Sequence, residues 1–190
     1  MKDPARCLPP RYHAVRFYEN EQSLSHIVAE FLGDGLATGT PGIVVATPAQ
    51  RAAIVRALVA RGIDVVRLQH SGDLVLLDAE QQLSLFMTNG RPDAARFRNC
   101  MCEVINGARR GQSNCVTRIY GQMVDVLWKD GQQEAAIHLE MLWNQLANTE
   151  AFSLLCGYAM GNFYKSANFD GICGHHTHVI SADGDAAAVA

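Results

Sequence analysis

Apolar positions follow two alternating periods along the chain, short runs typical of buried strands and stripes typical of helices. The strands predicted from this pattern are His13–Tyr18, Ile43–Thr47, Asp64–Leu68, Leu74–Leu77, Cys115–Tyr120 and Phe152–Gly157. The predicted helices begin at Ser23, at Pro48 and after Asp78, carry Phe97 to Ala108, and cover Gly121–Trp128 and Gln132–Asn148. Strands that alternate with helices, without an internal repeat, predict a three-layer α/β/α sandwich with a mostly parallel sheet.

The carboxyl ends of the predicted strands are where ligands bind in open parallel sheets. Two strands, with two helices between them, make a crossover unit that places Tyr120–Met123 and Cys156–Tyr158 at this edge. Neutral polar groups beside aromatic rings suit an uncharged or weakly polar small molecule. The candidate ligand-binding residues are Tyr18, Glu19, Tyr120, Gln122, Cys156 and Tyr158. A plain strand-to-helix turn with core residues Met123 and Trp128 is the alternative.

Composition changes this picture only by excluding some partners. With 190 residues, 48% of them hydrophobic, the chain suits one compact domain, predicted over residues 13–180 between a flexible arm (1–12) and a disordered tail (181–190). A net charge of -3 argues against nucleic acid as a partner. No segment resembles a membrane span or a signal peptide, and the six cysteines are scattered, so we expect a cytoplasmic protein with reduced thiols and no membrane partner.

Enzymatic chemistry finds little support in the motifs. A phosphate-binding loop needs glycines, a lysine and a hydroxyl, but Glu19–Ser25 has neither glycine nor lysine and carries two carboxylates. Asp78 has the place of an acidic magnesium ligand, although a helix cap is the favoured interpretation. The Gly-x-Ser-x-Gly motif is absent. We therefore expect no enzyme activity and no cofactor.

Thiol and imidazole groups gather in the segment Cys173–His178, and these are ligands that zinc prefers. Structural zinc sites draw ligands from two separated segments, whereas these residues are close together, so a histidine-rich helix end is favoured over a metal site. The alternative is a metal- or redox-responsive module that uses Cys173, His175, His176 and His178 with Cys156. Glu140 and Asn144 lie one turn apart on a predicted helix and could face the crevice or solvent, of which we favour solvent.

Six motifs, in this order, resemble the MEDS domain, a sensory domain of methanogens, methylotrophs and dichloromethane-responsive regulators. They are His13–Glu19, Phe31–Leu36, Arg118–Met123, Leu139–Asn144, Phe152–Tyr158 and Ile172–Val179. The resemblance runs from about His13 to Ile180 and implies a degenerate RecA/KaiC-like fold that lacks the phosphate-binding loop. Family members commonly have glutamate where this chain has Gln122, which leaves an acidic role there unsupported.

The resemblance implies a non-enzymatic domain that senses small molecules, hydrocarbon derivatives among them, and passes the signal to a partner. A histidine kinase, a transcription regulator or an anti-sigma module is the expected kind of partner, and self-association is a further option. Our leading hypothesis is a small ligand bound in the degenerate nucleotide crevice that regulates such a partner. Nucleotide binding without hydrolysis is a further alternative.

Overall fold

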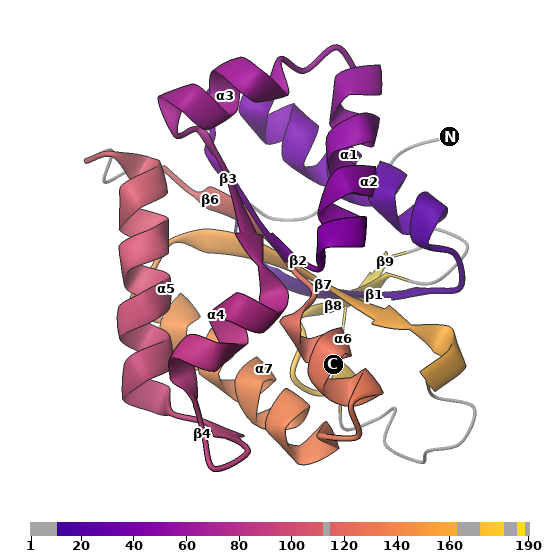
Figure 1. The fold of residues 1–190 in the computed structure, drawn as a ribbon, viewed down its shortest axis with the longest axis vertical. Helices are drawn as coiled ribbons and strands as arrows, with labels where there is room; N and C mark the ends of the chain where they lie inside the picture. The colour runs from indigo at the N-terminus through magenta and orange to yellow at the C-terminus, as the bar shows by residue number, and fades with distance from the viewer. Residues whose placement is uncertain (1–10, 112–114, 163–171, 181–185, 189–190) are drawn as a thin grey trace.

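A mixed sheet forms the middle layer of the molecule (Figure 1). The computed structural model describes residues 11–111, 115–162, 172–180 and 186–188. The sheet has the order β3-β2-β6-β7-β1-β8-β9, in which only β9 is antiparallel to its neighbour. Its strands are β1 (His13–Tyr18), β2 (Gly42–Ala46), β3 (Leu74–Asp78), β6 (Thr117–Gly121), β7 (Phe152–Ala159), β8 (His178–Ile180) and β9 (Ala186–Ala188).

Helices cover both faces of this sheet (Figure 1). The first face carries α1 (Glu21–Ala37), α2 (Pro48–Ala60) and α3 (Val65–Ser71), and the second carries α4 (Ala79–Phe86), α5 (Ala94–Arg109), α6 (Met123–Lys129) and α7 (Gln133–Ala147). A hairpin of β4 (Met87–Thr88) and β5 (Arg91–Pro92) joins α4 to α5, and the 3-10 helix η2 (Met160–Asn162) follows β7. The predicted three-layer α/β/α fold with a mostly parallel sheet is confirmed.

Each face of the sheet has its own hydrophobic core, because successive side chains of a strand point to opposite sides. In β7, Cys156 and Tyr158 lie in the core under α4 to α7, while Leu155 lies in the core under α1 to α3. In β1, Phe17 and Tyr18 divide in the same way. This alternation decides which of the candidate residues can meet.

Short polar side chains fix the starts of several helices, as their capping preference predicts. Asn20 accepts hydrogen bonds from the backbone N–H groups of Gln22 and Ser23 at the start of α1. Asp78 accepts from the N–H groups of Glu80 and Gln81 at the start of α4. The prediction that Asp78 is a helix cap is therefore confirmed.

The predicted strand at Asp64–Leu68 is wrong, because the segment is part of helix α3. Asp64 caps this helix by accepting from the N–H of Arg67, and Gly72 ends it in the left-handed conformation. Val65 and Leu68 are buried three residues apart, which is a helical spacing. The cap and the spacing together outweigh the strand preference of two adjacent valines.

Most of the predicted arm and tail lie outside the described residues. Within the predicted tail, Ala186–Ala188 forms strand β9 beside β8. In the part of the chain that the structure describes, no helix combines the length and apolarity needed to cross a bilayer.

Candidate functional site

Asp125 of α6 is the centre of a polar cluster at the carboxyl edge of the sheet. Its side chain is fully buried, and its Oδ1 accepts a hydrogen bond from the backbone N–H of Ala159 at 3.0 Å. Its Oδ2 accepts from the Tyr18 hydroxyl at 2.9 Å and lies 2.8 Å from Nζ of Lys129. The cluster therefore connects the ends of β1 and β7 to the helix that follows β6.

Gln122 lies beside this cluster and holds the start of α2 in place. Its Oε1 accepts hydrogen bonds from the backbone N–H of Thr47 at 3.0 Å and from the Thr47 hydroxyl at 3.2 Å. Because Gln122 is almost fully buried, these bonds satisfy the carbonyl end of its amide inside the protein. The side chain thus ties the end of β6 to the β2–α2 turn.

The candidate ligand-binding residues divide between the two faces of the sheet. Tyr18 and Tyr120 lie in the core under α1 to α3, whereas Cys156 and Tyr158 lie in the core under α4 to α7. Glu19 is exposed in the turn after β1. No single crevice can take all of these side chains as first neighbours, and their roles in ligand binding stay predictions.

A second polar cluster, the α7 cluster, lies wholly within the core under α4 to α7. It consists of His13 from β1, Glu140 and Asn144 from α7, Cys156 and Tyr158 from β7, and His176 from the segment before β8. Glu140 is fully buried at its centre. Its Oε2 lies 3.1 Å from His13 Nε2 and 3.6 Å from Cys156 Sγ. Its Oε1 accepts from the Tyr158 hydroxyl at 2.8 Å and lies 3.3 Å from His176 Nε2.

Burial and charge set the protonation of the α7 cluster. Burial alone would raise the pKa of Glu140, but the positive charge of His176 and the hydrogen bonds from His13 and His176 outweigh it, so the pKa of Glu140 is lowered. Burial, followed by the charge of Glu140, raises the pKa values of Cys156 and Tyr158 well above their ordinary range. Burial and the neighbouring His176 lower the pKa of His13. Without a further cation, Glu140 is thus ionised and Cys156 is a neutral thiol.

The α7 cluster corrects one sequence-based expectation and changes another. Glu140 was expected to face solvent but is fully buried, because side chains from β1 and from the segment before β8 surround its carboxylate. Of the residues that the sequence suggested as metal ligands, Cys156 and His176 lie in the α7 cluster. The others, Cys173, His175 and His178, do not belong to its group of potential ligands. Sequence reasoning missed Glu140, and it had His13 only as one of several distant histidines that could complete a metal site. The available signals were a histidine opening a buried strand and a glutamate on the apolar side of its helix.

Two grooves open on the surface near these clusters. The first has a volume of about 580 Å³ and lies between the first turns of α1 and the whole length of α2. Its lining residues are Glu21, Gln22, Ser25, His26, Ala49, Ala53, Arg56, Ala57 and Ala60. We call it the α1–α2 groove. It borders the carboxyl edge, since Glu21 follows Tyr18 closely and Ala49 follows Thr47.

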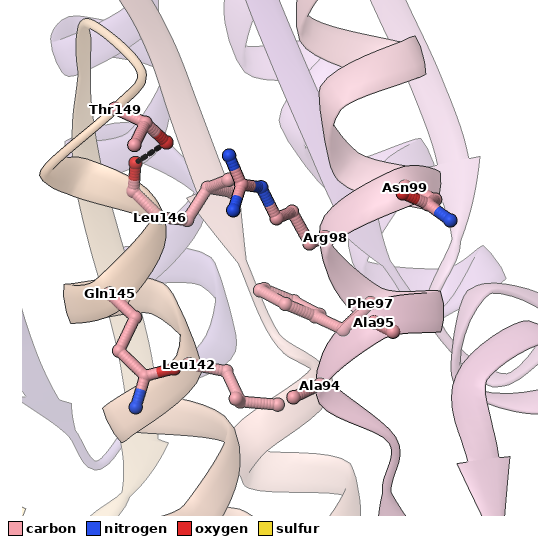
Figure 2. A pocket seen from close by; sticks show the side chains of 9 residues that line it. All are labelled: Ala94, Ala95, Phe97, Arg98, Asn99, Leu142, Gln145, Leu146 and Thr149. Atoms are coloured by element: carbon pink, nitrogen blue, oxygen red, sulfur yellow. Dashed lines mark hydrogen bonds between the residues drawn. The ribbon is translucent and has the colours of Figure 1, made fainter.

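The second groove has a volume of about 440 Å³ and separates α5 from α7. Figure 2 shows Phe97 and Arg98 reaching from α5 toward α7, with Arg98 directed toward Leu146. Leu142 and Ala94 close its lower end. None of the polar residues of the two clusters lines this groove.

The turn between β1 and α1 has the position of a phosphate-binding loop but not its form. Only Glu19 and Asn20 separate the strand from the helix. Asn20 already accepts hydrogen bonds from the N–H groups of Gln22 and Ser23, which would face a bound phosphate in a phosphate-binding loop. The Ser25 hydroxyl donates to the carbonyl of Glu21 and accepts from Gln50. The geometry thus agrees with the residue types in this segment.

This architecture defines a KaiC-like α/β fold whose phosphate-loop position has no glycine-rich loop. A KaiC-like protein from the hyperthermophilic archaeon Pyrococcus horikoshii is similar in structure, with a TM-score of 0.64 and 13% sequence identity over 92% of this chain and 73% of that one. The family profile of the methanogen/methylotroph, DcmR sensory domain (MEDS) matches residues 12–177. The chain belongs to the MEDS family. A comparison with curated proteins found no match.

Proposed function

We propose that this chain senses a small, uncharged or weakly polar molecule in the α1–α2 groove, without hydrolysing nucleotide, and regulates a separate signalling protein. The observation that carries the proposal is the groove itself, an open volume of about 580 Å³ beside the carboxyl edge where ligands of parallel α/β sheets bind. Membership in a sensory family supports the same role. A histidine kinase, a transcription regulator or an anti-sigma module is the expected kind of partner.

The lining of the groove favours a neutral ligand over a nucleotide. Ala49, Ala53, Ala57 and Ala60 give it an apolar wall. At the end next to β1, Glu21 would repel a triphosphate, and the Asn20 side chain occupies the first N–H groups of α1. Arg56 also lines the groove, so it is Glu21 and the capped N–H groups of α1 that disfavour a nucleotide here.

A ligand at this place has a route to the rest of the fold. Gln50 on α2 bonds Ser25 on α1 at 3.3 Å, and Thr47 before α2 bonds Gln122 after β6. A ligand that changes the separation of α1 and α2 would thus also act on the Gln122 contact. Regulation requires that the ligand bind two conformations with different affinity.

A bulky side chain introduced into the groove tests this proposal. Ala53→Phe places a ring among the lining residues, whereas Ala52→Phe places the same ring on the exposed side of the same helix. Small alcohols, ketones and halogenated alkanes are screened by native mass spectrometry, and hits are titrated by calorimetry. We expect Ala53→Phe to abolish binding and Ala52→Phe to preserve it. Equal affinity in the two variants would rule out this groove, and steady ATP turnover by the purified chain would rule out a purely sensory role.

A further inference from the structure

The α7 cluster brings together four side chains whose ligand atoms suit a transition metal. The Nε2 atoms of His13 and His176, Sγ of Cys156 and a carboxylate oxygen of Glu140 all lie within 4.8 Å of one another, and all four residues are buried. We propose that these residues bind one divalent cation of the zinc type. This inference goes beyond the sensory function and does not depend on where the small molecule binds.

The hydrogen-bond acceptors beside the Nδ1 atoms of His13 and His176 hold a proton there, so Nε2 has none when these rings are neutral. Nδ1 of His176 lies 2.8 Å from the carbonyl oxygen of Ile172, which can only accept, so this nitrogen carries the proton. Asn144 donates its Nδ2 to the carbonyl of His175 at 2.7 Å, which turns its Oδ1 toward Nδ1 of His13 at 2.9 Å. That nitrogen must donate too. In both neutral rings, Nε2 then holds a lone pair that faces Glu140.

As long as both rings are neutral, protons within the cluster do not satisfy these contacts. The Nε2 atoms of His13 and His176 lie 3.1 Å and 3.3 Å from oxygens of an ionised carboxylate, so lone pairs face lone pairs. Nε2 of His176 has no hydrogen-bond partner among the described residues. The Cys156 thiol has one proton and can serve only one acceptor. With a cation at the centre, the atoms of each contact become ligands of the same ion, and their lone pairs face the cation instead of one another.

Three edges of the cluster agree with tetrahedral coordination. Zinc lies about 2.0 Å from nitrogen or oxygen and about 2.3 Å from sulfur, which gives tetrahedral edges of about 3.3–3.6 Å. The edges of the cluster are 3.4 Å from His13 Nε2 to Cys156 Sγ, and 3.1 Å and 3.6 Å from these two atoms to Glu140 Oε2. His176 Nε2 lies 3.3 Å from the other carboxylate oxygen.

A divalent ion keeps the charge of the buried site balanced, as a single proton on His176 would also do. Binding releases the thiol proton of Cys156 to solvent, so one thiolate, one carboxylate and two neutral imidazoles surround a double positive charge. The buried site is then neutral overall. Protonating both histidines instead would leave a net positive charge, with two cationic rings whose centroids are 4.2 Å apart.

The surrounding residues have the form of an outer shell of a metal site. Ligating histidines almost always donate their other ring N–H to a carbonyl or carboxylate, and both histidines do so here. The Tyr158 hydroxyl holds one oxygen of Glu140. The ligands come from β1, α7, β7 and the segment before β8, and four protein ligands leave no open position. The ion would therefore be structural and would join these four segments.

Metal analysis of the full chain tests the site. The protein is purified without chelators, its zinc content is measured by elemental analysis, and the chelator-treated form is titrated with Zn²⁺ and Co²⁺. We expect one equivalent of bound metal and, with Co²⁺, a thiolate charge-transfer absorption. Cys156→Ser should abolish that absorption, and His176→Ala should lose the bound metal. Cys173→Ser and His178→Ala, which alter the same kinds of side chain nearby, should keep both.

The wild-type titration decides the matter even if a ligand variant fails to fold. A chain that is folded by circular dichroism but takes up neither Zn²⁺ nor Co²⁺ at equimolar concentration would show that protons hold the cluster, through an ion pair of His176 with Glu140. Metal that survives in Cys156→Ser and His176→Ala but is lost in Cys173→Ser or His178→Ala would assign it to the C-terminal segment and overturn the proposal. Neither result bears on ligand binding in the α1–α2 groove.

Discussion

The Tyr120 hydroxyl lies directly over Gly157 in the neighbouring strand. A Cβ at Gly157 would lie 3.0 Å from Tyr120 Oη and 3.4 Å from Leu24 Cδ2, closer than packed side chains normally allow. The glycine therefore makes room for a buried tyrosine whose hydroxyl has no hydrogen-bond partner among the described residues.

Gly157→Ala should destabilise the protein, because the methyl group overpacks this contact. We expect the free energy of unfolding, measured with urea, to fall by roughly 1–3 kcal/mol. Tyr120→Phe removes the closest atom and should restore part of the loss in the double variant. Gly107→Ala is the matched control, since a Cβ there meets nothing within 4 Å and a helical alanine should stabilise slightly. Equal effects at the two glycines would contradict the packing argument.

Asp125→Ala should destabilise the protein more strongly than a typical surface change. The substitution leaves the buried Tyr18 hydroxyl and the Ala159 N–H without their acceptor and removes the ion pair with Lys129. We expect a loss of about 3 kcal/mol in urea unfolding. Asp130→Ala, five residues along in the same region and exposed, should change stability by less than about 0.5 kcal/mol. A small effect at Asp125 would show that the cluster is not a structural anchor.

Alkaline pH should weaken the fold through the buried tyrosines. Burial, followed by the negative charge of Asp125, raises the pKa of Tyr18, and burial raises that of Tyr120. Above about pH 10 the unfolded chain loses phenolic protons that the folded chain keeps, so stability falls as the pH rises. Each such tyrosine contributes a slope of about 1.4 kcal/mol per pH unit.

Urea unfolding between about pH 9 and pH 11.5 measures this slope. Tyr18→Phe should reduce it by the contribution of one group, although the variant starts from a lower stability because Asp125 loses a donor. An unchanged slope in Tyr18→Phe would mean that this tyrosine ionises in the folded protein.

The residue pattern determines most of the fold but not the pairing of side chains across it. Apolar runs such as Ile43–Thr47 locate the parallel strands, and the alternation within β7 already puts Cys156 and Tyr158 on one face. The prediction failed at Asp64–Leu68, where two valines favour a strand and a cap together with a terminal glycine favours a helix. The cap and the helical spacing of the buried Val65 and Leu68 outweigh the valines here.

Glu140 shows why the α7 cluster escapes prediction from local pattern. A glutamate on a helix normally faces water, since burying a lone charge is costly. Here His13 and His176, separated by most of the chain, meet its two oxygens. Only the strand order, which places β7 beside β1 and β1 beside β8, brings these partners together. Gln122 was correctly placed at the carboxyl edge, because the end of a strand is visible in the sequence.

Arg109→Ala should destabilise the opposite, amino-terminal edge of the sheet. Arg109 at the end of α5 donates to Thr117 at 3.2 Å, to the carbonyl of Ala151, and to Glu150 at 2.8 Å, so one guanidinium joins α5 to the starts of β6 and β7. The side chain is only 8% exposed, and its loss leaves Glu150 without its cation. We expect the free energy of unfolding to fall by about 3 kcal/mol.

Arg96→Ala removes the same charge from the exposed side of the same helix and should change stability by less than about 0.5 kcal/mol. Arg109→Lys should recover little of the stability lost in Arg109→Ala, because a lysine ammonium cannot donate to three acceptors arranged around a planar guanidinium. If Arg109→Lys matched the wild type in urea unfolding, charge alone would explain the contact and the fork geometry would not matter.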